Sequence, residues 1–287
     1  MEFQLWYLWV IIGYIVVCVA IYYFQESFFF HPEKLSPDFH FKYDSAFREV
    51  NFEIDGKTSI HGLHFYSEYP KGIILYFHGN TRSVKGWGKY AVDFLRHYFD
   101  VVMIDYRGFG KSTGKRTEKT LFSDAQCVYD KVKLKFPENN IIIYGRSMGS
   151  GIAAELASKN NPSKLILDAP YYSFLNVTKK YAPLLPIGLL LRFHIRTDIF
   201  LQKVKCNTFI IHGSKDRLIP ITASKKLRNI DPSRIILLPI KFGGHNNLPK
   251  FPIYHQFLED ILNDKIDPKN KFGLDDDDLF ELTLRNN

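Results

Sequence analysis

Residues 141–157 read IIIYGRSMGSGIAAELA: an apolar run, then the pattern G-x-S-x-G, then a stretch rich in Ala and Leu. The apolar run predicts a buried strand, and the stretch after the pattern predicts a helix. A turn tight enough to join them leaves no room for side chains at Gly145 and Gly149, and it presents Ser147 at the positive end of the helix. The pattern alone occurs by chance, and a lone serine here is read as a helix cap. The strand before it and the helix after it favour a nucleophile elbow.

Apolar runs alternate with helical stretches on both sides of this segment. The predicted strands are residues 48–54, 60–66, 72–77, 101–105, 140–144, 164–168, 208–212 and 234–238. The predicted helices are residues 87–98, 120–136, 148–159, 221–230 and 249–263. Short continuous apolar runs are typical of strands that are buried on both faces of a parallel sheet. A hairpin followed by repeated strand–helix units predicts an α/β fold with a mostly parallel central sheet and helices on both faces.

Two later loops supply the groups that activate a serine. A serine hydroxyl is a weak nucleophile near neutral pH, so it needs a base, and the base needs an orienting acid. The strand TFIIH leads into GSKDRLIP, which contains Asp216, and the strand RIILLP leads into IKFGGHNNL, which contains His245. The carboxyl ends of parallel strands meet at one edge of a sheet, where ligands bind. We therefore predict Ser147 as the nucleophile, His245 as its base and Asp216 as the orienting acid.

Other acids and histidines also follow strands. Asp168 ends the strand LILD and is a possible substitute acid, although a residue there more often holds a loop. Asp105 ends a strand before the nucleophile in the chain, and we interpret it as structural. His78 and His212 close strands and are interpreted as wall or loop-anchoring residues, and His194 is not expected to act as a base.

The loop YFHGNT, residues 76–81, follows the strand expected before the first large helix. An HG pair at this place lets the chain turn so that the next backbone N–H points at the reacting carbonyl oxygen. We predict an oxyanion hole made of the backbone N–H groups of Asn80 and Met148, with Thr81 as the second choice for the loop donor.

Residues 5–24, LWYLWVIIGYIVVCVAIYYF, carry no charged side chain, and a helix of this length spans the roughly 30 Å hydrocarbon core of a bilayer. Aromatic residues gather at both ends, as they do at membrane interfaces. A cleavable signal peptide is the alternative, but it normally has a basic start and a small-residue cleavage site. We predict a retained, single-pass membrane anchor. Lys34, Lys42 and Arg48 follow the span and no basic residue precedes it, which favours a cytoplasmic catalytic domain.

We therefore divide the chain into a membrane anchor (residues 1–27), a catalytic domain (28–265) and an acidic C-terminal tail (266–287), interpreted as frayed rather than as a metal site. Within the domain, residues 171–200 are too long for an ordinary connection and too apolar for a solvent loop, and they predict a short lid. The apolar residues gathered in this lid are Leu184, Leu185, Ile187, Leu189, Leu190, Leu191 and Phe193. They either pack the lid onto the domain or line an acyl pocket that faces the bilayer.

Composition narrows the function classes. The net charge is +8, from 38 Lys and Arg against 30 Asp and Glu, but the basic residues are scattered. We therefore expect a solvated basic surface and no nucleic-acid partner.

Three cysteines are too few for a disulfide framework, and none has metal-ligand spacing. GFGKST, residues 108–113, resembles the end of a P-loop, but Asp105 stands where its first glycine belongs. Neither ATP nor NAD is supported, and we expect no cofactor, no metal ion and no obligate protein partner.

The motifs HGNTR, DYRGFGKSTG, GRSMGSG, HGSKDRLIP and GGHNN stand in this order along the chain. Together they resemble α/β-hydrolases of the serine aminopeptidase-like group. The apolar N-terminus followed by FFFHPEKL is similar to membrane-anchored α/β-hydrolase domain proteins, whose relatives include protein depalmitoylases. Matched residue by residue, the resemblance implies an α/β-hydrolase fold, the triad Ser147, Asp216 and His245, and the oxyanion donors Asn80 and Met148. It implies no particular substrate, because the group includes esterases, lipases, thioesterases and peptidases.

These observations predict a membrane-anchored serine hydrolase that cleaves carboxylic esters or thioesters through an acyl-enzyme intermediate. Its substrate is expected to be a small molecule or an acylated, lipid-like compound. One alternative is a serine peptidase or amidase of the aminopeptidase-like group. Another is a non-catalytic, membrane-anchored binding protein on the same fold.

Overall fold

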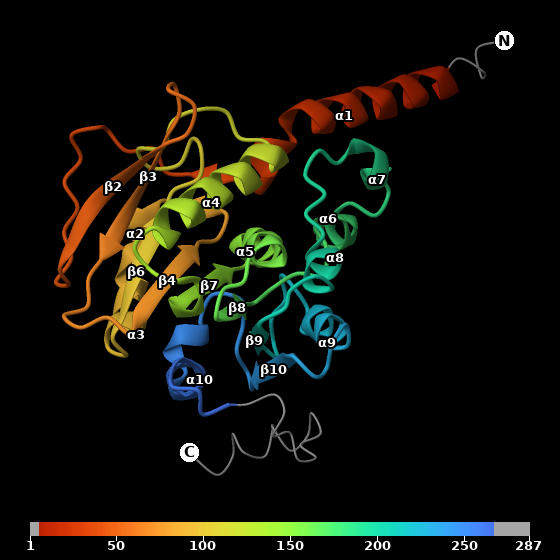
Figure 1. Cartoon of the computed structure of the whole chain (residues 1–287). Helices are drawn as coiled ribbons and strands as arrows, with labels where there is room; N and C mark the ends of the chain where they lie inside the picture. Colours follow the sequence, from red (N-terminus) through yellow and green to blue (C-terminus); the bar gives the residue numbers. More distant parts are fainter. Residues whose placement is uncertain (1–5, 267–287) are drawn as a thin grey trace.

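A computed structural model describes residues 6–266, and its centre is an eight-stranded sheet in the order β10-β9-β8-β7-β4-β6-β3-β2 (Figure 1). The strands are β2 (Phe47–Glu53), β3 (Ser59–Phe65), β4 (Gly72–Phe77), β6 (Phe99–Ile104), β7 (Ile141–Arg146), β8 (Lys164–Asp168), β9 (Asn207–Gly213) and β10 (Ile235–Ile240). All eight coincide with the strands predicted from the apolar runs. The β2–β3 and β3–β6 pairs are antiparallel and every other pair is parallel, so the predicted mostly parallel sheet is confirmed.

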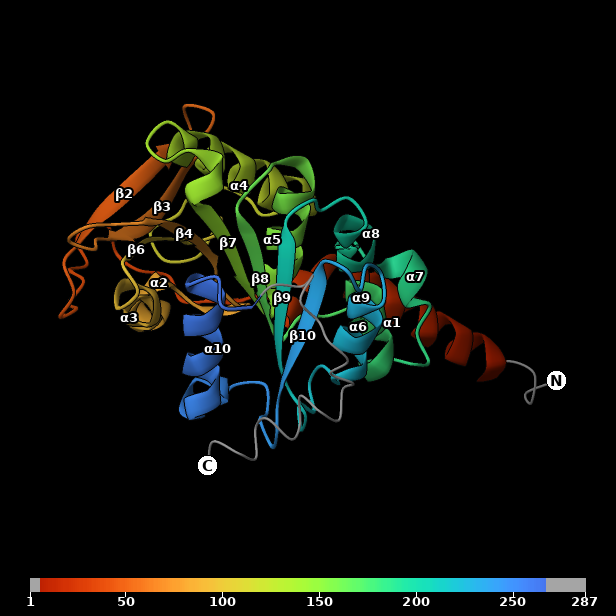
Figure 2. The same ribbon diagram turned by 60° about the horizontal axis from the view of Figure 1, so that its bottom comes forward.

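Helices cover both faces of the sheet, as predicted (Figure 2). One apolar core lies under α4 (Glu118–Lys133), α5 (Met148–Lys159), α8 (Thr197–Leu201) and α9 (Thr222–Arg228). The other core lies under α2 (Val84–Trp87), α3 (Val92–Leu95) and α10 (Pro252–Leu262). The β7 strand is buried along its whole length, which explains its uninterrupted apolar run.

The helix predicted over residues 87–98 is wrong as a single element. The chain there forms α2, a 3₁₀ turn (Gly88–Ala91) and α3 instead. Glycines stand on both sides of Trp87, and each costs about 1 kcal/mol in a helix interior relative to alanine. Gly88 is also required by packing, because a Cβ atom there would lie 2.5 Å from the Tyr43 ring. The sequence analysis also missed a two-residue parallel pairing of β1 (His31–Pro32) with β5 (Thr81–Arg82).

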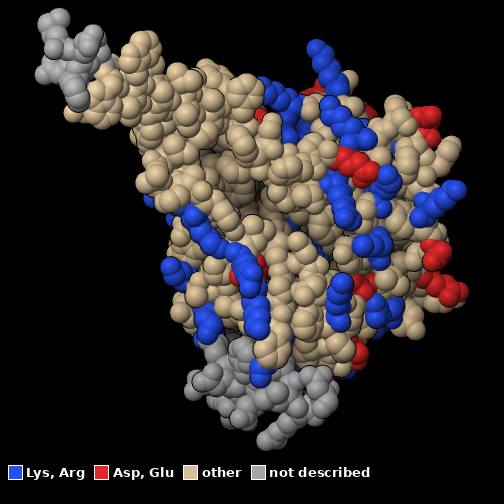
Figure 3. Space-filling model, turned by 180° about the vertical axis from the view of Figure 1, so that it is seen from behind, with Lys and Arg blue, Asp and Glu red and all other residues tan. Residues whose placement is uncertain are grey.

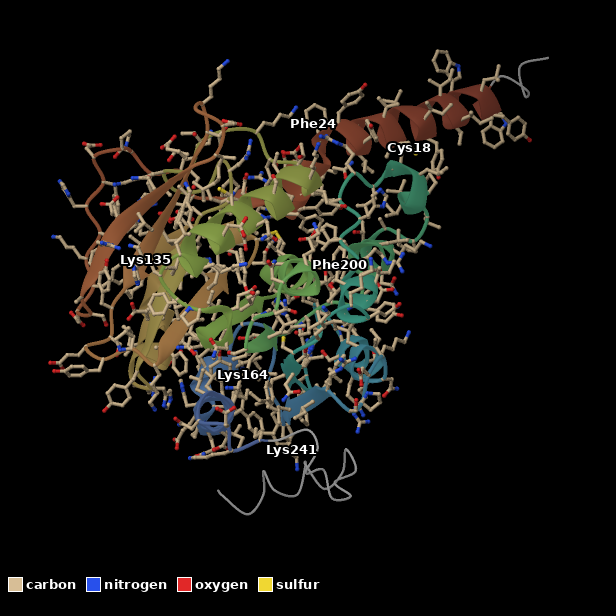
Figure 4. The ribbon with its side chains drawn as sticks, in the orientation of Figure 1. Cys18, Phe24, Lys135, Lys164, Phe200 and Lys241 are labelled. Atoms are coloured by element: carbon tan, nitrogen blue, oxygen red, sulfur yellow. The ribbon has the colours of Figure 1, made fainter. Side chains whose placement is uncertain are left out.

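The N-terminal helix α1 (Trp6–Phe29) projects from the domain (Figure 1). By length and composition it is long and apolar enough to cross a membrane, and most of its surface is exposed. Cys18 lies along the helix beside α7 (Ile187–Leu190), and Phe24 lies nearer the domain (Figure 4). The predicted acidic tail lies outside the described residues, apart from its first position, Ile266.

Residues 171–200 form α6 (Phe174–Tyr181), α7 and α8 between β8 and β9. The Ser173 hydroxyl caps α6 by accepting a hydrogen bond from the backbone N–H of Asn176. Part of the segment packs into the main core, through Ile187, Leu191 and Phe193. Two other apolar residues of the segment, Leu184 and Leu189, are exposed.

Candidate active site

Ser147 lies in a sharp turn between β7 and α5. Its φ angle is +50° and its ψ angle is −117°, a conformation that non-glycine residues adopt only where the surrounding structure enforces it. Packing explains both glycines of the motif. A Cβ atom at Gly149 would lie 2.2 Å from the carbonyl oxygen of Phe77, and one at Gly145 would lie 2.5 Å from the carbonyl oxygen of Gly149. The turn therefore holds the Ser147 hydroxyl at the carboxyl edge of the sheet.

The structure brings the three residues predicted as a triad within hydrogen-bonding distance. The Ser147 Oγ atom lies 2.9 Å from His245 Nε2, and His245 Nδ1 lies 2.7 Å from Asp216 Oδ2. Asp216 follows β9 and His245 follows β10, so neighbouring strands of the parallel sheet deliver them to one edge. With the proton on Nδ1, the imidazole donates to Asp216 and accepts from the Ser147 hydroxyl, which is the arrangement that a general base requires.

Asp216 is held in place and kept ionised by its neighbours. Its Oδ1 accepts hydrogen bonds from the backbone N–H groups of Leu218 and Ile219, at 2.9 and 2.8 Å. Burial by itself raises the pKa of the carboxyl, but the hydrogen bonds of His212 and His245 outweigh burial and hold the pKa of Asp216 well below its usual range. His212, interpreted from sequence as a wall or loop-anchoring residue, therefore also stabilises the ionised Asp216, at 3.3 Å from its Oδ2.

This shift makes a prediction about stability. Because the pKa of Asp216 is lower in the folded protein, its ionised form stabilises the fold above the unfolded pKa of about 4, and that contribution is lost as the pH falls further. We expect Asp216→Asn to lose less thermal stability than the wild type between pH 7 and pH 3, as measured by thermal melts in detergent. Ser147→Ala, which keeps Asp216 and its partners, should follow the wild type. Parallel melting curves for Asp216→Asn and wild type would contradict this assignment.

The two other acids considered from sequence, Asp168 and Asp105, have hydrogen-bond partners other than His245. Asp168 is fully buried, and its Oδ2 accepts hydrogen bonds from the hydroxyls of Tyr144 at 2.6 Å and Tyr254 at 3.2 Å, with Arg146 Nη1 at 3.5 Å. Asp105 accepts the backbone N–H of Val84 at 2.9 Å. Both therefore hold structure, as was interpreted for Asp105, while Asp168, the possible substitute acid, is paired with two tyrosines and Arg146.

Of the histidines, His78 is fully buried and His194 is exposed. Neither is bonded to Ser147. Arg146, the residue before Ser147, was not predicted to have a role at the site. Its guanidinium is buried beside Asp168, and its Nη2 donates to the carbonyl oxygen of His245 at 3.3 Å. Arg146 thus positions the loop of the base, and only its place inside G-x-S-x-G signals this.

The two predicted oxyanion donors, Asn80 and Met148, line the same cavity as Ser147. The Asn80 side chain donates to the carbonyl oxygen of Phe29 at 2.7 Å, and the Asn80 carbonyl accepts the backbone N–H of His31 at 2.8 Å. These contacts fix the loop after β4 without using the backbone N–H of Asn80. The alternative donor, Thr81, is exposed in β5 and does not line the cavity.

A cavity of about 400 Å³ opens at Ser147, and its lining is mostly apolar. Three parts of the chain contribute walls: Ile21 and Phe28 of α1, Val177 and Leu185 of the 171–200 segment, and Leu218 of the loop after β9. Figure 3 shows that the projecting helix and the surface next to it consist mainly of uncharged residues, with a hollow beneath the helix and basic residues along the border of this area. The space suits an apolar chain attached to a carbonyl group at Ser147.

Known proteins resemble this chain in sequence and in structure. A family model described as serine aminopeptidase, S33, matches residues 68–199. The uncharacterized protein R595 of Acanthamoeba polyphaga mimivirus is 29% identical over 288 residues, which cover 85% of this chain and 94% of that protein. The lysophosphatidylserine lipase ABHD12 of Bos taurus is 29% identical over 195 residues, which cover 58% of this chain and 47% of that protein.

Among solved structures, an esterase from Pyrococcus furiosus superposes with a TM-score of 0.65 at 19% identity, covering 82% of this chain and 98% of that one. At this identity the likeness concerns the fold. The chain spans about half the length of the bovine lipase. The observed sheet with its sharp strand–serine–helix turn, taken with these likenesses, shows that the chain belongs to the α/β-hydrolase superfamily.

Proposed function

We propose that this protein is a membrane-anchored serine hydrolase that cleaves carboxylic esters or thioesters with lipid-like acyl groups. One observation carries the proposal: the hydrogen-bonded series Ser147–His245–Asp216 ends at an apolar cavity rather than at open solvent. A binding protein has no physical need for a serine in a strained turn, a base on its hydroxyl and a buried acid on the base.

The chemistry follows from these positions. His245 takes the Ser147 proton as the hydroxyl oxygen attacks the acyl carbonyl, and the imidazolium is stabilised by Asp216. The tetrahedral oxyanion is stabilised by the backbone N–H groups of Asn80 and Met148. His245 then protonates the leaving alcohol or thiol, which departs and leaves an acyl-enzyme on Ser147. Water, activated by the same imidazole, hydrolyses the acyl-enzyme and restores the free serine.

The substrate class is inferred from the cavity and from the relatives. The cavity walls named above are aliphatic and aromatic side chains, which favour a hydrocarbon chain. The bovine relative is named as a lysophosphatidylserine lipase, and the superposed archaeal protein as an esterase. We infer that the substrate carries one long acyl chain on an alcohol or thiol.

The same proposal assigns residues 1–27 to the membrane anchor, residues 28–265 to the catalytic domain and residues 171–200 to a lid. The apolar helix α1 supports the anchor. The basic residues Lys34, Lys42 and Arg48 after α1 favour a catalytic domain on the cytoplasmic side. A tethered enzyme meets membrane lipids at high local concentration, which suits an acyl substrate.

Chain-length preference tests the substrate class. We expect kcat/KM for p-nitrophenyl esters to rise from acetyl to octanoyl, because each buried methylene contributes at most about 0.8 kcal/mol to binding. Leu185→Ser should flatten this rise, because Leu185 lines the cavity. Leu189→Ser is the matched control and should keep the wild-type slope with these soluble esters, because Leu189 is exposed and does not line the cavity.

The same assay separates the alternatives. A wild-type preference for acetyl esters would contradict the acyl pocket, and a preference for aminoacyl amides over all esters would favour the peptidase. If the chain neither reacts with a fluorophosphonate probe nor turns over any ester or amide, the non-catalytic binding protein is the better description.

A further inference from the structure

One face of the second half of α1 is packed against the domain. Cys18, Ile21 and Phe29 are half-buried and Gln25 is only 1% exposed, while the residues between them are mostly exposed. Their spacing of three to four residues forms one stripe along a helix. The stripe reaches up to Tyr14, whose hydroxyl donates to the carbonyl oxygen of Leu184 at 3.1 Å. The helix therefore runs alongside the domain rather than leaving it at its last turn.

Gln25 fastens this helix to the 171–200 segment. Its Nε2 donates to the carbonyl oxygen of Leu190 at 2.9 Å, and its Oε1 accepts the backbone N–H of Arg192 at 2.8 Å. Both backbone groups lie at the end of α7. Glu26, one residue later, pairs with the Arg192 guanidinium at 3.2 Å. These two bonds leave neither backbone group unpaired where Gln25 excludes water from them.

The segment to which Gln25 is hydrogen-bonded has an apolar composition that suits the hydrocarbon core of a bilayer. Residues 182–191, APLLPIGLLL, which we call the α7 segment, contain no charged residue, and Lys180 and Arg192 stand close to its two ends. Leu184 is 87% exposed and Leu189 is 85% exposed. Both leucines belong to the same short segment, which lies beside α1 (Figure 1), so exposed apolar residues of the two elements lie side by side.

The position of these contacts along α1 indicates whether lipid or water surrounds the α7 segment. Tyr14 and Phe24 are ten residues apart, which is about 15 Å at 1.5 Å per residue. The uncharged run that ends at Phe24 is taken to occupy the hydrocarbon core. The α7 segment is hydrogen-bonded to Tyr14, so it then reaches the same depth as Tyr14, near the middle of a roughly 30 Å core. At the other end of these contacts, Glu26 and Arg192 form an ion pair near the level expected for the headgroups.

We propose that the α7 segment lies in the bilayer beside α1, so that the acyl cavity opens to lipid rather than to water. This rests on the proposed membrane anchor and deepens the proposed function. Phe28 and Phe29 of α1 line the cavity, and so do Leu185 and Ile187 of the α7 segment. The acyl chain of a membrane lipid then passes between α1 and the α7 segment to Ser147 without crossing water, and α1 is part of the substrate site as well as an anchor.

Depth measurement tests the position directly. The full chain, with its three cysteines replaced by Ala, is reconstituted in phosphatidylcholine vesicles and spin-labelled at Leu189→Cys or at Leu134→Cys. Leu134 is also 85% exposed but lies after α4, away from α1, and is the matched control. We expect the label at 189 to collide more with oxygen than with a water-soluble nickel complex, and the label at 134 to show the reverse. Equal water accessibility at the two positions overturns the proposal.

Turnover in vesicles provides a second measurement that keeps the native cysteines. Leu184→Ser combined with Leu189→Ser should lower kcat/KM for a palmitoyl ester embedded in the vesicles by about ten-fold, because polar side chains are costly in hydrocarbon, and leave hydrolysis of a soluble acetyl ester unchanged. Leu134→Ser should change neither. An unchanged palmitoyl rate in the double variant overturns the proposal. Absence of any Ser147-dependent turnover would instead refute the proposed function, and the spin-label result would still decide the position of the segment.

Discussion

Ser147→Ala is expected to lower kcat for activated esters by roughly six orders of magnitude, the loss that follows removal of the nucleophile from a Ser-His-Asp site. The reason is that the attacking oxygen is lost, while the oxyanion donors and the cavity remain. Labelling by a fluorophosphonate should disappear as well. Turnover is measured with a soluble p-nitrophenyl ester, and folding is checked by circular dichroism and thermal melting.

Ser158→Ala is the matched control for this variant. Ser158 lies in the same helix, α5, but near its far end, where its hydroxyl donates to the carbonyl oxygen of Glu155 at 2.6 Å. We expect full activity and full labelling from this control. Labelling that persists unchanged in Ser147→Ala would show that another residue is the nucleophile.

Asp216→Asn is expected to lower kcat by about 10⁴, because an amide no longer selects the imidazole tautomer whose Nε2 accepts the Ser147 proton. The structure locates the effect in one bond, the 2.7 Å contact between His245 Nδ1 and Asp216 Oδ2. The fall should appear in kcat much more than in KM, since Asp216 does not line the cavity. Steady-state kinetics across pH 6 to 9 provide the measurement.

Asp168→Asn is the comparison that separates the two acids. Asp168 is fully buried beside Arg146, whose charge would lose its buried partner, so the variant should be destabilised by about 3–5 kcal/mol. Its kcat per folded molecule should stay within about ten-fold of the wild type, because Asp168 bonds to two tyrosines and not to the imidazole. If Asp168→Asn loses kcat and Asp216→Asn keeps it, the assignment of the acid is wrong.

The sequence by itself determined the sheet, the strand–serine–helix turn and the loops that carry Asp216 and His245. These features are encoded locally. Each central strand is buried on both faces, so its residues are apolar without interruption, and G-x-S-x-G records the close approach that only glycines allow at the turn. In a parallel sheet, the loops that follow the strands all lie at the same edge, whatever the remaining sequence is. The order of the strands therefore sufficed to infer that Ser147, Asp216 and His245 lie close together.

Only the tertiary structure decided how the cavity is walled. Leu185 and Leu189 look alike in sequence, yet Leu185 lines the cavity and Leu189 is exposed. Nothing local indicates that Gln25 of an apolar helix bonds to the backbone of Leu190, a residue 165 positions later. Long-range contacts of this kind depend on how helices and strands pack against each other, and hydrophobic periodicity carries no information about that packing. Because of these contacts, the helix predicted as an anchor also lines the cavity at Ser147.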